Sequence, residues 1–196
     1  MLLRRFFSSV KGDVKEIIFD IPTNYRRLGV KELYFVNATE VNKTFLRSHQ
    51  DVRHEYFVSE QKSDASTFKT FYIKSYFGRT CEGPPMHAHG GLTAALLDEA
   101  MGTSCWCNHI GVMTKEFTTK YHVPVKLNEE IHGVAYIKEI SEDGYHIKTY
   151  GKLFYPDDEQ RVLVETNGIF KKLSDKQLLR MQTWSKNSRH LHLNSS

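Results

Sequence analysis

The pattern of apolar and polar positions becomes regular from residue 67 onward. Thr67–Phe77 is rich in aromatic and β-branched residues, which predicts a strand with Phe71, Ile73 and Phe77 on one face. A loop follows, and Gly91–Trp106 is then almost wholly apolar. A helix that is apolar on all sides is a buried helix, and this one is about 24 Å long if it is regular.

Four further runs rich in β-forming residues follow the helix, and each predicts a strand. The runs are Val112–Val123, Glu130–Ile140, Tyr145–Tyr155 and Arg161–Leu173. The connections between them contain the turn residues Pro124, Asn128, Ser141–Gly144 and Pro156–Asp158. Short antiparallel hairpins are therefore expected. A capping box over Ser174–Gln177 predicts a closing helix that ends near Trp184.

These elements predict an α+β fold, in which an antiparallel sheet wraps around a central buried helix. The domain extends over residues 67–184, and a polar tail follows over residues 185–196. Residues 13–66 form an N-terminal extension. Its charged stretch with scattered aromatic residues, from Asn24 to Gln61, predicts one or two helices packed outside the core.

Residues 1–12 contain basic, apolar and serine residues but no acid, which is typical of a mitochondrial presequence. Their apolar stretch is too short for a secretory signal. We therefore expect a mitochondrial matrix protein, with the cytoplasm as the alternative. No apolar run is long enough to cross a bilayer, so no integral membrane segment is expected.

Charge and cysteine content exclude several classes of function. The net charge of +4 is modest, and Arg4 and Arg5 lie within the expected presequence, so no nucleic-acid partner is expected. Three cysteines are an odd number and do not suggest a disulfide scaffold. The pairs His87/His89 and Cys105/Cys107 do not have the spacing of zinc ligands, so no metal is expected.

The start and the middle of the predicted helix carry the candidate chemistry. His89-Gly90-Gly91 opens the helix, and the first N–H groups of a helix have no partner within it. Two glycines allow a ligand oxygen to approach these groups closely. Such donors, followed two turns later by the carboxylate of Asp98, suit acyl-transfer chemistry, which needs an oxyanion site and a base or nucleophile.

Asp98 and Glu99 are adjacent acids in an otherwise apolar helix, and they point about 100° apart. Asp98 shares its side of the helix with Gly91, Ala94 and Ala95, whose small side chains leave room for a substrate. Glu99 is expected to be a solvated or ion-paired acid without a catalytic role.

The residues from His89 to Pro124 resemble a known family. His-Gly-Gly is followed by an acid nine residues after the histidine, and the run continues through Gly102 and Val112-Met113-Thr114 to Tyr121 and Pro124. This pattern resembles the hotdog-fold acyl-CoA thioesterases, in the branch of the 4-hydroxybenzoyl-CoA and phenylacetate-pathway enzymes. It is most similar to the mitochondrial members of the thioesterase superfamily, and the resemblance covers residues 67–173.

The resemblance implies a hotdog fold and hydrolysis of acyl-CoA to a free acid, with a fatty acid expected, and coenzyme A. It assigns Asp98 as general base or nucleophile, Gly90 and Gly91 as the groups that polarise the carbonyl, and His89 and Thr114 as orienting residues. It also implies a homodimer or homotetramer in which Thr114 reaches the Asp98 of a second subunit. Coenzyme A is part of the substrate, and no cofactor is implied. Lys115, Lys171 and Lys172 are candidate contacts for its phosphates.

Two alternatives remain open at this point. One is a hotdog hydratase or dehydratase, and the other is a non-catalytic acyl-CoA-binding module. The sequence also departs from some relatives at Gly83-Pro84-Pro85, where those proteins carry an asparagine before the His-Gly-Gly turn.

Overall fold

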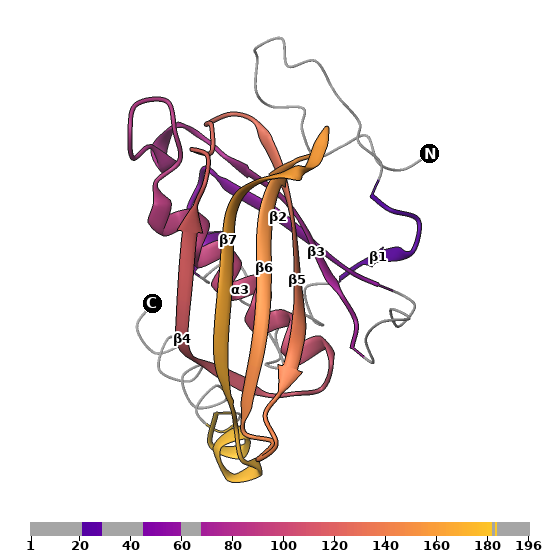
Figure 1. Ribbon diagram of the computed structural model, residues 1–196. Coiled ribbons are helices and arrows are strands. Elements are labelled where there is room, and N and C mark those ends of the chain that lie inside the picture. Colours follow the sequence, from indigo (N-terminus) through magenta and orange to yellow (C-terminus); the bar gives the residue numbers. More distant parts are fainter. Residues whose placement is uncertain (1–20, 29–44, 60–67, 182, 184–196) are drawn as a thin grey trace, which may run out of the picture.

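The computed structural model describes residues 21–28, 45–59, 68–181 and 183, and within them a seven-stranded antiparallel sheet wraps around one long helix (Figure 1). The strand order is β1-β2-β3-β5-β6-β7-β4. The strands are β1 (Tyr25–Arg27), β2 (Val52–Ser59), β3 (Phe71–Phe77), β4 (Val112–Tyr121), β5 (Glu130–Ile140), β6 (His146–Tyr155) and β7 (Asp158–Lys172). The predicted α+β class and the wrapped sheet are confirmed.

The central helix α3 spans Gly90–Cys107, one residue longer at each end than predicted. His89 caps its start and Asn108 its end. Leu96, Leu97 and Met101 are fully buried against the sheet, which confirms that an apolar helix lies in the core. Burying each of these side chains stabilises the fold by about 1.5–3 kcal/mol relative to exposure.

The four strands after α3 follow the predicted pattern closely. β5 has the predicted bounds. β4 ends two residues earlier than predicted, β6 begins one residue later, and β7 begins three residues and ends one residue earlier. The connections also use the expected turn residues, because Asn128 and Gly144 both have positive φ angles (60° and 70°). At the C-terminal end, Ser174 Oγ and Gln177 Oε1 form the predicted capping box, and helical residues 175–181 follow it.

The N-terminal extension contributes strands to the sheet, which the sequence did not predict. β2 pairs with β3 along its whole length, and Tyr56 and Val58 of β2 lie in the core at 1% and 2% exposure. The expectation of helices packed outside the core is therefore wrong over residues 52–59. A short helix, α2 (Phe45–Ser48), precedes β2, while residues 29–44 and 60–67 lie outside the described residues.

A core substitution in α3 tests the burial on which this fold depends. Leu97 is fully buried, and its Cδ2 atom would lie 3.0 Å from a Cβ placed on Gly151 of β6. Leu97→Ala is expected to lower the free energy of unfolding by about 2–5 kcal/mol in urea denaturation. The control Leu179→Ala, at a position 64% exposed, should change it by less than about 0.5 kcal/mol. Equal effects at the two positions would contradict this account of the core.

Candidate functional site

The start of α3 is capped by the side chain of His89. His89 Nδ1 accepts a hydrogen bond from the Gly91 N–H at 3.0 Å, so the ring proton of the neutral imidazole lies on Nε2. The expectation that both glycines present open N–H groups is therefore wrong for Gly91. Among the described residues, none accepts a hydrogen bond from the Gly90 N–H. Gly90 thus offers an open donor at the positive end of the helix dipole.

Tyr121 lies against the same turn. Its hydroxyl donates to the carbonyl oxygen of Gly90 at 3.1 Å, and a Cβ on Gly90 would lie 3.3 Å from its ring. The sequence pattern included Tyr121 only as part of the family resemblance and gave it no role. Because this contact joins the last residue of β4 to the first residue of α3, Tyr121 fixes where the Gly90 N–H group lies.

Asp98 lies two turns further along α3 and contacts the other end of β4. Thr114 Oγ1 donates to Asp98 Oδ1 at 2.8 Å, and both residues belong to the same chain. The expectation that Thr114 reaches the Asp98 of a second subunit is therefore wrong, because the fold itself supplies this contact. Partial burial raises the pKa of the Asp98 carboxyl above its ordinary value, while the hydrogen bond from Thr114 lowers it in part.

The Gly90 donor and the Asp98 carboxylate of one chain are well separated. They lie eight residues apart on α3, which corresponds to about 12 Å along the helix axis at 1.5 Å per residue. An attacking oxygen and an oxyanion donor must both lie about 3 Å from one reacting carbonyl group. The two groups of a single chain therefore cannot act on the same carbonyl.

Glu99 points to the other side of the helix, as the sequence predicts. The hydroxyl of Tyr56 in β2 donates to Glu99 Oε1 at 2.7 Å, and His54 Nε2 lies 3.7 Å from the same oxygen. The carboxylate therefore joins β2 to α3. This structural role agrees with the expectation that Glu99 is a paired acid.

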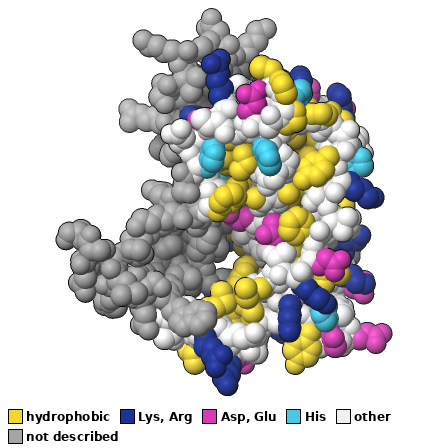
Figure 2. All heavy atoms as spheres, turned by 90° about the vertical axis from the view of Figure 1, so that its left-hand side faces the viewer, with side chains coloured by type: hydrophobic (Ala, Val, Ile, Leu, Met, Phe, Trp, Pro, Cys, Tyr) yellow, Lys and Arg dark blue, Asp and Glu magenta, His cyan; other side chains and the backbone are white. Residues whose placement is uncertain are grey.

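β4 forms one edge of the sheet and exposes apolar side chains. Met113, Phe117 and Tyr121 are 58%, 39% and 55% exposed. Figure 2 shows the side of the molecule that carries β4, where apolar side chains lie among histidines and acids. The unpaired backbone groups of such an edge are available for pairing with another strand.

The groups considered as metal ligands are engaged elsewhere. His87 Nδ1 lies 2.8 Å from the carbonyl oxygen of Pro85, and Cys105 is buried, which raises the pKa of its thiol to about 12. Within residues 21–28, 45–59, 68–181 and 183, no three His, Cys, Asp or Glu side chains gather as a metal site would require. None of the helices described there is both long and apolar enough to span a membrane.

Comparison with known proteins finds similar sequences and folds. Residues 86–143 match the family model of the thioesterase superfamily, and this segment contains His89, Gly90, Asp98 and Thr114. No curated protein matches the chain. One solved structure, of a thioesterase superfamily protein, is 27% identical with a TM-score of 0.51, and the match covers 59% of this chain and 53% of that one. The chain thus spans about half the length of that relative.

More distant structures share the fold. A hypothetical thioesterase from Streptococcus pneumoniae, solved with coenzyme A, is 12% identical over 61% of this chain and 89% of its own, with a TM-score of 0.51. A protein from Streptococcus mutans, bound to acetyl CoA, is 9% identical over 60% of this chain and 87% of its own, with a TM-score of 0.50. The chain therefore has the hotdog fold, and its residues 86–143 are similar to the thioesterase superfamily.

Proposed function

We propose that this protein hydrolyses acyl-CoA thioesters to a carboxylic acid and free coenzyme A. The observation that carries the proposal is the half-buried carboxylate of Asp98, which Thr114 orients within an otherwise apolar helix. A buried carboxylate is costly unless it has a partner or a function. The similarity of residues 86–143 to the thioesterase superfamily supports the same reaction, and the coenzyme A and acetyl CoA bound to two structural relatives support this substrate class.

The reaction requires an attacking oxygen and a site for the developing oxyanion. Asp98 either removes a proton from a water that attacks the thioester carbon, or attacks that carbon itself to form an anhydride that water then hydrolyses. In both routes the carbon–sulfur bond breaks, coenzyme A leaves as the thiolate and takes up a proton, and water supplies the hydroxyl of the acid. The Gly90 N–H group donates to the oxyanion, and His89 and Thr114 orient the two halves of the site.

The proposed substrate lies between α3 and the edge strand. Phe117 and Tyr121 share the helix-facing side of β4 with Thr119, whose hydroxyl contacts the buried Thr166. The half-exposed rings of Phe117 and Tyr121 thus lie between the Asp98 end and the Gly90 end of the site. An apolar acyl group suits these rings, which supports a fatty acyl substrate.

Two copies of the chain are proposed to complete each site. At one end of β4 Thr114 contacts Asp98, and at the other end Tyr121 contacts Gly90. If two β4 edges pair antiparallel about a two-fold axis near their middle, the Gly90 end of one copy lies beside the Asp98 end of the other. This arrangement overcomes the separation of about 12 Å within one helix. A homodimer is therefore the proposed minimal unit, and pairing of dimers into a tetramer remains open.

We also propose mitochondrial targeting through residues 1–12, which lie outside the described residues. Their basic, acid-free composition supports this localisation. The chemistry proposed for Asp98 needs no cofactor or metal.

Replacing the catalytic carboxylate tests the assignment directly. Asp98→Asn keeps the size and the hydrogen bond with Thr114 but removes the base, so kcat for acyl-CoA hydrolysis should fall by about 10²–10⁴-fold in a thiol-release assay. Glu99→Gln is the matched control on the next residue and should leave kcat nearly unchanged. Full activity of the Asp98 variant, or an equal loss in the Glu99 variant, would contradict the assignment.

The pH profile tests the hydrogen bond that Thr114 donates. This bond stabilises the ionised form of Asp98, so its loss in Thr114→Val raises the pKa of the carboxyl further. Because the ionised form is the active one, the acid limb of the kcat/KM profile should move to higher pH. Thr118→Val, which changes a threonine on the outer side of β4, should leave the limb in place. An unchanged limb in the Thr114 variant would disprove this role.

A mixed dimer tests the composite site. An Asp98→Asn chain and a Gly90→Val chain should each be inactive alone. Every site in the first homodimer lacks the carboxylate, and in the second the valine side chain blocks the approach of the substrate to the N–H group of residue 90. A purified mixed dimer should regain about half of the wild-type activity, since one of its two sites contains an intact Asp98 and an intact Gly90. A dimer of two differently tagged Asp98→Asn chains is the control. No recovery in the mixed dimer would show that each chain uses its own two groups.

A further inference from the structure

The end of the molecule beyond the last turn of α3 exposes several apolar side chains. Figure 1 shows that the C-terminal helical residues 175–181 and the turn between β5 and β6 both lie at this end. Nine large apolar side chains are exposed in the described part of the chain. Four of them belong to these two segments or to the end of β5 that leads into the turn, namely Ile140, Tyr145, Leu179 and Met181. Such a gathering of exposed apolar side chains is typical of an interaction site.

The C-terminal helix is anchored by one of its two leucines and exposes the other. A Cβ atom placed on Gly111 would lie 2.7 Å from Leu178 Cδ2, so Leu178 packs against the loop that follows α3. Leu179 is 64% exposed. Successive helical residues point about 100° apart, which places Lys176 and Arg180 on the side opposite Leu178 and Leu179 between the two sides. The helix therefore presents one apolar and two basic side chains away from the fold.

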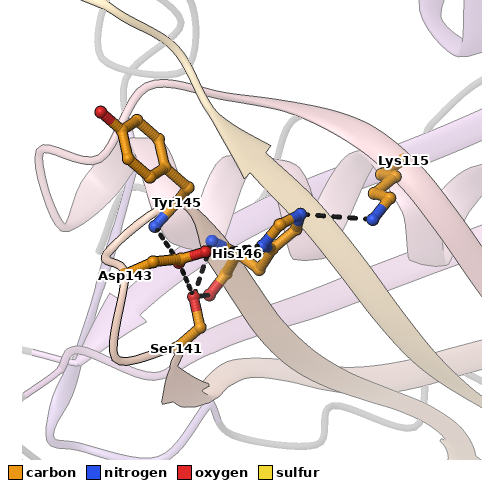
Figure 3. A network of polar contacts seen from close by, with 5 residues as sticks. All are labelled: Lys115, Ser141, Asp143, Tyr145 and His146. Carbon is orange, nitrogen blue, oxygen red and sulfur yellow. Dashed lines mark hydrogen bonds and ion pairs between the residues drawn. The ribbon is translucent and has the colours of Figure 1, made fainter.

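Tyr145 projects from a turn whose backbone is fixed. Its N–H donates to Asp143 Oδ1 at 2.8 Å, and its carbonyl oxygen accepts from the Lys172 N–H at 2.8 Å. Figure 3 shows that its ring points away from the polar network of Ser141, Asp143 and His146 that holds the turn. The backbone of the turn is thus already ordered, so a partner that takes up the ring pays little entropy for it. Tyrosine rings of this kind are enriched where membranes meet water.

Cations surround these apolar side chains. Four are exposed on β7 and on the C-terminal helix, namely Lys171, Lys172, Lys176 and Arg180. Within the residues that the structure describes, no carboxylate oxygen lies within 4 Å of their charged atoms. The acids of this end are fewer, namely Glu142, Asp143 and Asp175, and Asp143 is engaged in its own turn. Residues 184–196 lie outside the described residues, and their sequence adds Lys186 and Arg189 but no acid.

Apolar side chains mixed with unneutralised cations complement a lipid surface that carries negative charge. The cations are attracted to anionic headgroups, and the apolar side chains enter the boundary between headgroups and acyl chains. A protein partner is less suited, because the core of a protein interface gathers apolar side chains and is depleted of charge. We propose that the basic–apolar end, formed by Tyr145, Lys171, Lys172, Lys176, Leu179 and Arg180, docks peripherally on bilayers that contain anionic lipids.

The basic–apolar end is compatible with the proposed dimer, because none of its residues lies on β4. It is also close to one end of that strand, since Lys172 is the register partner of Val112, two residues before Thr114. Docking therefore brings the Asp98 end of the site near a surface into which long acyl chains partition. The docking itself does not depend on the proposed thioesterase activity.

Co-sedimentation of the full-length protein with vesicles tests the inference. The wild type should bind vesicles of phosphatidylcholine mixed with phosphatidylglycerol about tenfold more tightly than vesicles of phosphatidylcholine alone, and added salt should weaken this binding. The double variant Lys176→Gln/Arg180→Gln should lower the partition coefficient on the mixed vesicles about tenfold, because two cations are lost. Leu179→Gln should lower it severalfold. Glutamine is a good helix former, and circular dichroism should show an unchanged fold.

Matched variants elsewhere on the surface control for charge and for apolar exposure. Lys138→Gln/Lys148→Gln removes two positive charges from the outer face of the sheet, where Lys138 lies over the Tyr150 ring and Lys148 pairs with Glu139. Met86→Gln removes an apolar side chain that is 67% exposed in the loop before α3. Both control proteins should bind the mixed vesicles as the wild type does.

Three results would overturn the inference. They are absence of wild-type binding to the mixed vesicles, equal binding to both kinds of vesicle, and wild-type binding by the Leu179 variant and the Lys176/Arg180 variant. Sedimentation without lipid provides a further test, because it detects docking of a second copy. Self-association beyond the dimer that is lost in Leu179→Gln would assign the basic–apolar end to a second copy of the chain and would also overturn the inference.

Discussion

The burial of α3 beneath the curved sheet is the constraint on which the rest of this structure depends. The helix is apolar on nearly all sides, and it also carries two neighbouring acids that point apart. Each acid accepts a hydrogen bond from the hydroxyl group of a different strand: Asp98 from Thr114 of β4, and Glu99 from Tyr56 of β2. β4 and β2, which supply these hydroxyls, lie near opposite ends of the strand order, so the pairing of the acids positions the helix across the whole sheet.

The sequence predicts the part of the fold that depends on local pattern. The bounds of α3 and of β5 are nearly as predicted because an apolar run and turn residues mark them directly. β2 was missed, since Arg53, His54 and Glu55 interrupt its apolar run and hide the alternation. Its place beside β3 depends on contacts with distant residues, such as the pairing of Tyr56 with Ile73, which no local window contains.

The candidate site shows the same division between local and distant information. The sequence points to Asp98 because a carboxylate in an apolar helix needs a function or a partner, and the family resemblance points to Thr114, which contacts it. The hydrogen bond from the Gly91 N–H to His89 depends on the side-chain conformation of His89. The spacing of residues in the sequence does not reveal that conformation.

The environment of Asp98 balances two requirements of the proposed chemistry. Burial raises the pKa of the carboxyl and makes it a stronger base, but it also reduces the fraction that is ionised. The hydrogen bond from Thr114 restores part of that ionised fraction. Thr114 donates this hydrogen bond from near the start of β4. Tyr121, the last residue of the same strand, contacts Gly90. The same edge strand therefore influences both the protonation of the carboxylate and the position of the Gly90 N–H group, the proposed oxyanion donor. In the proposed dimer, pairing of the two β4 strands would bring the Asp98 of one copy beside the Gly90 of the other. The same strand would therefore have to serve both the subunit contact and the arrangement of the site.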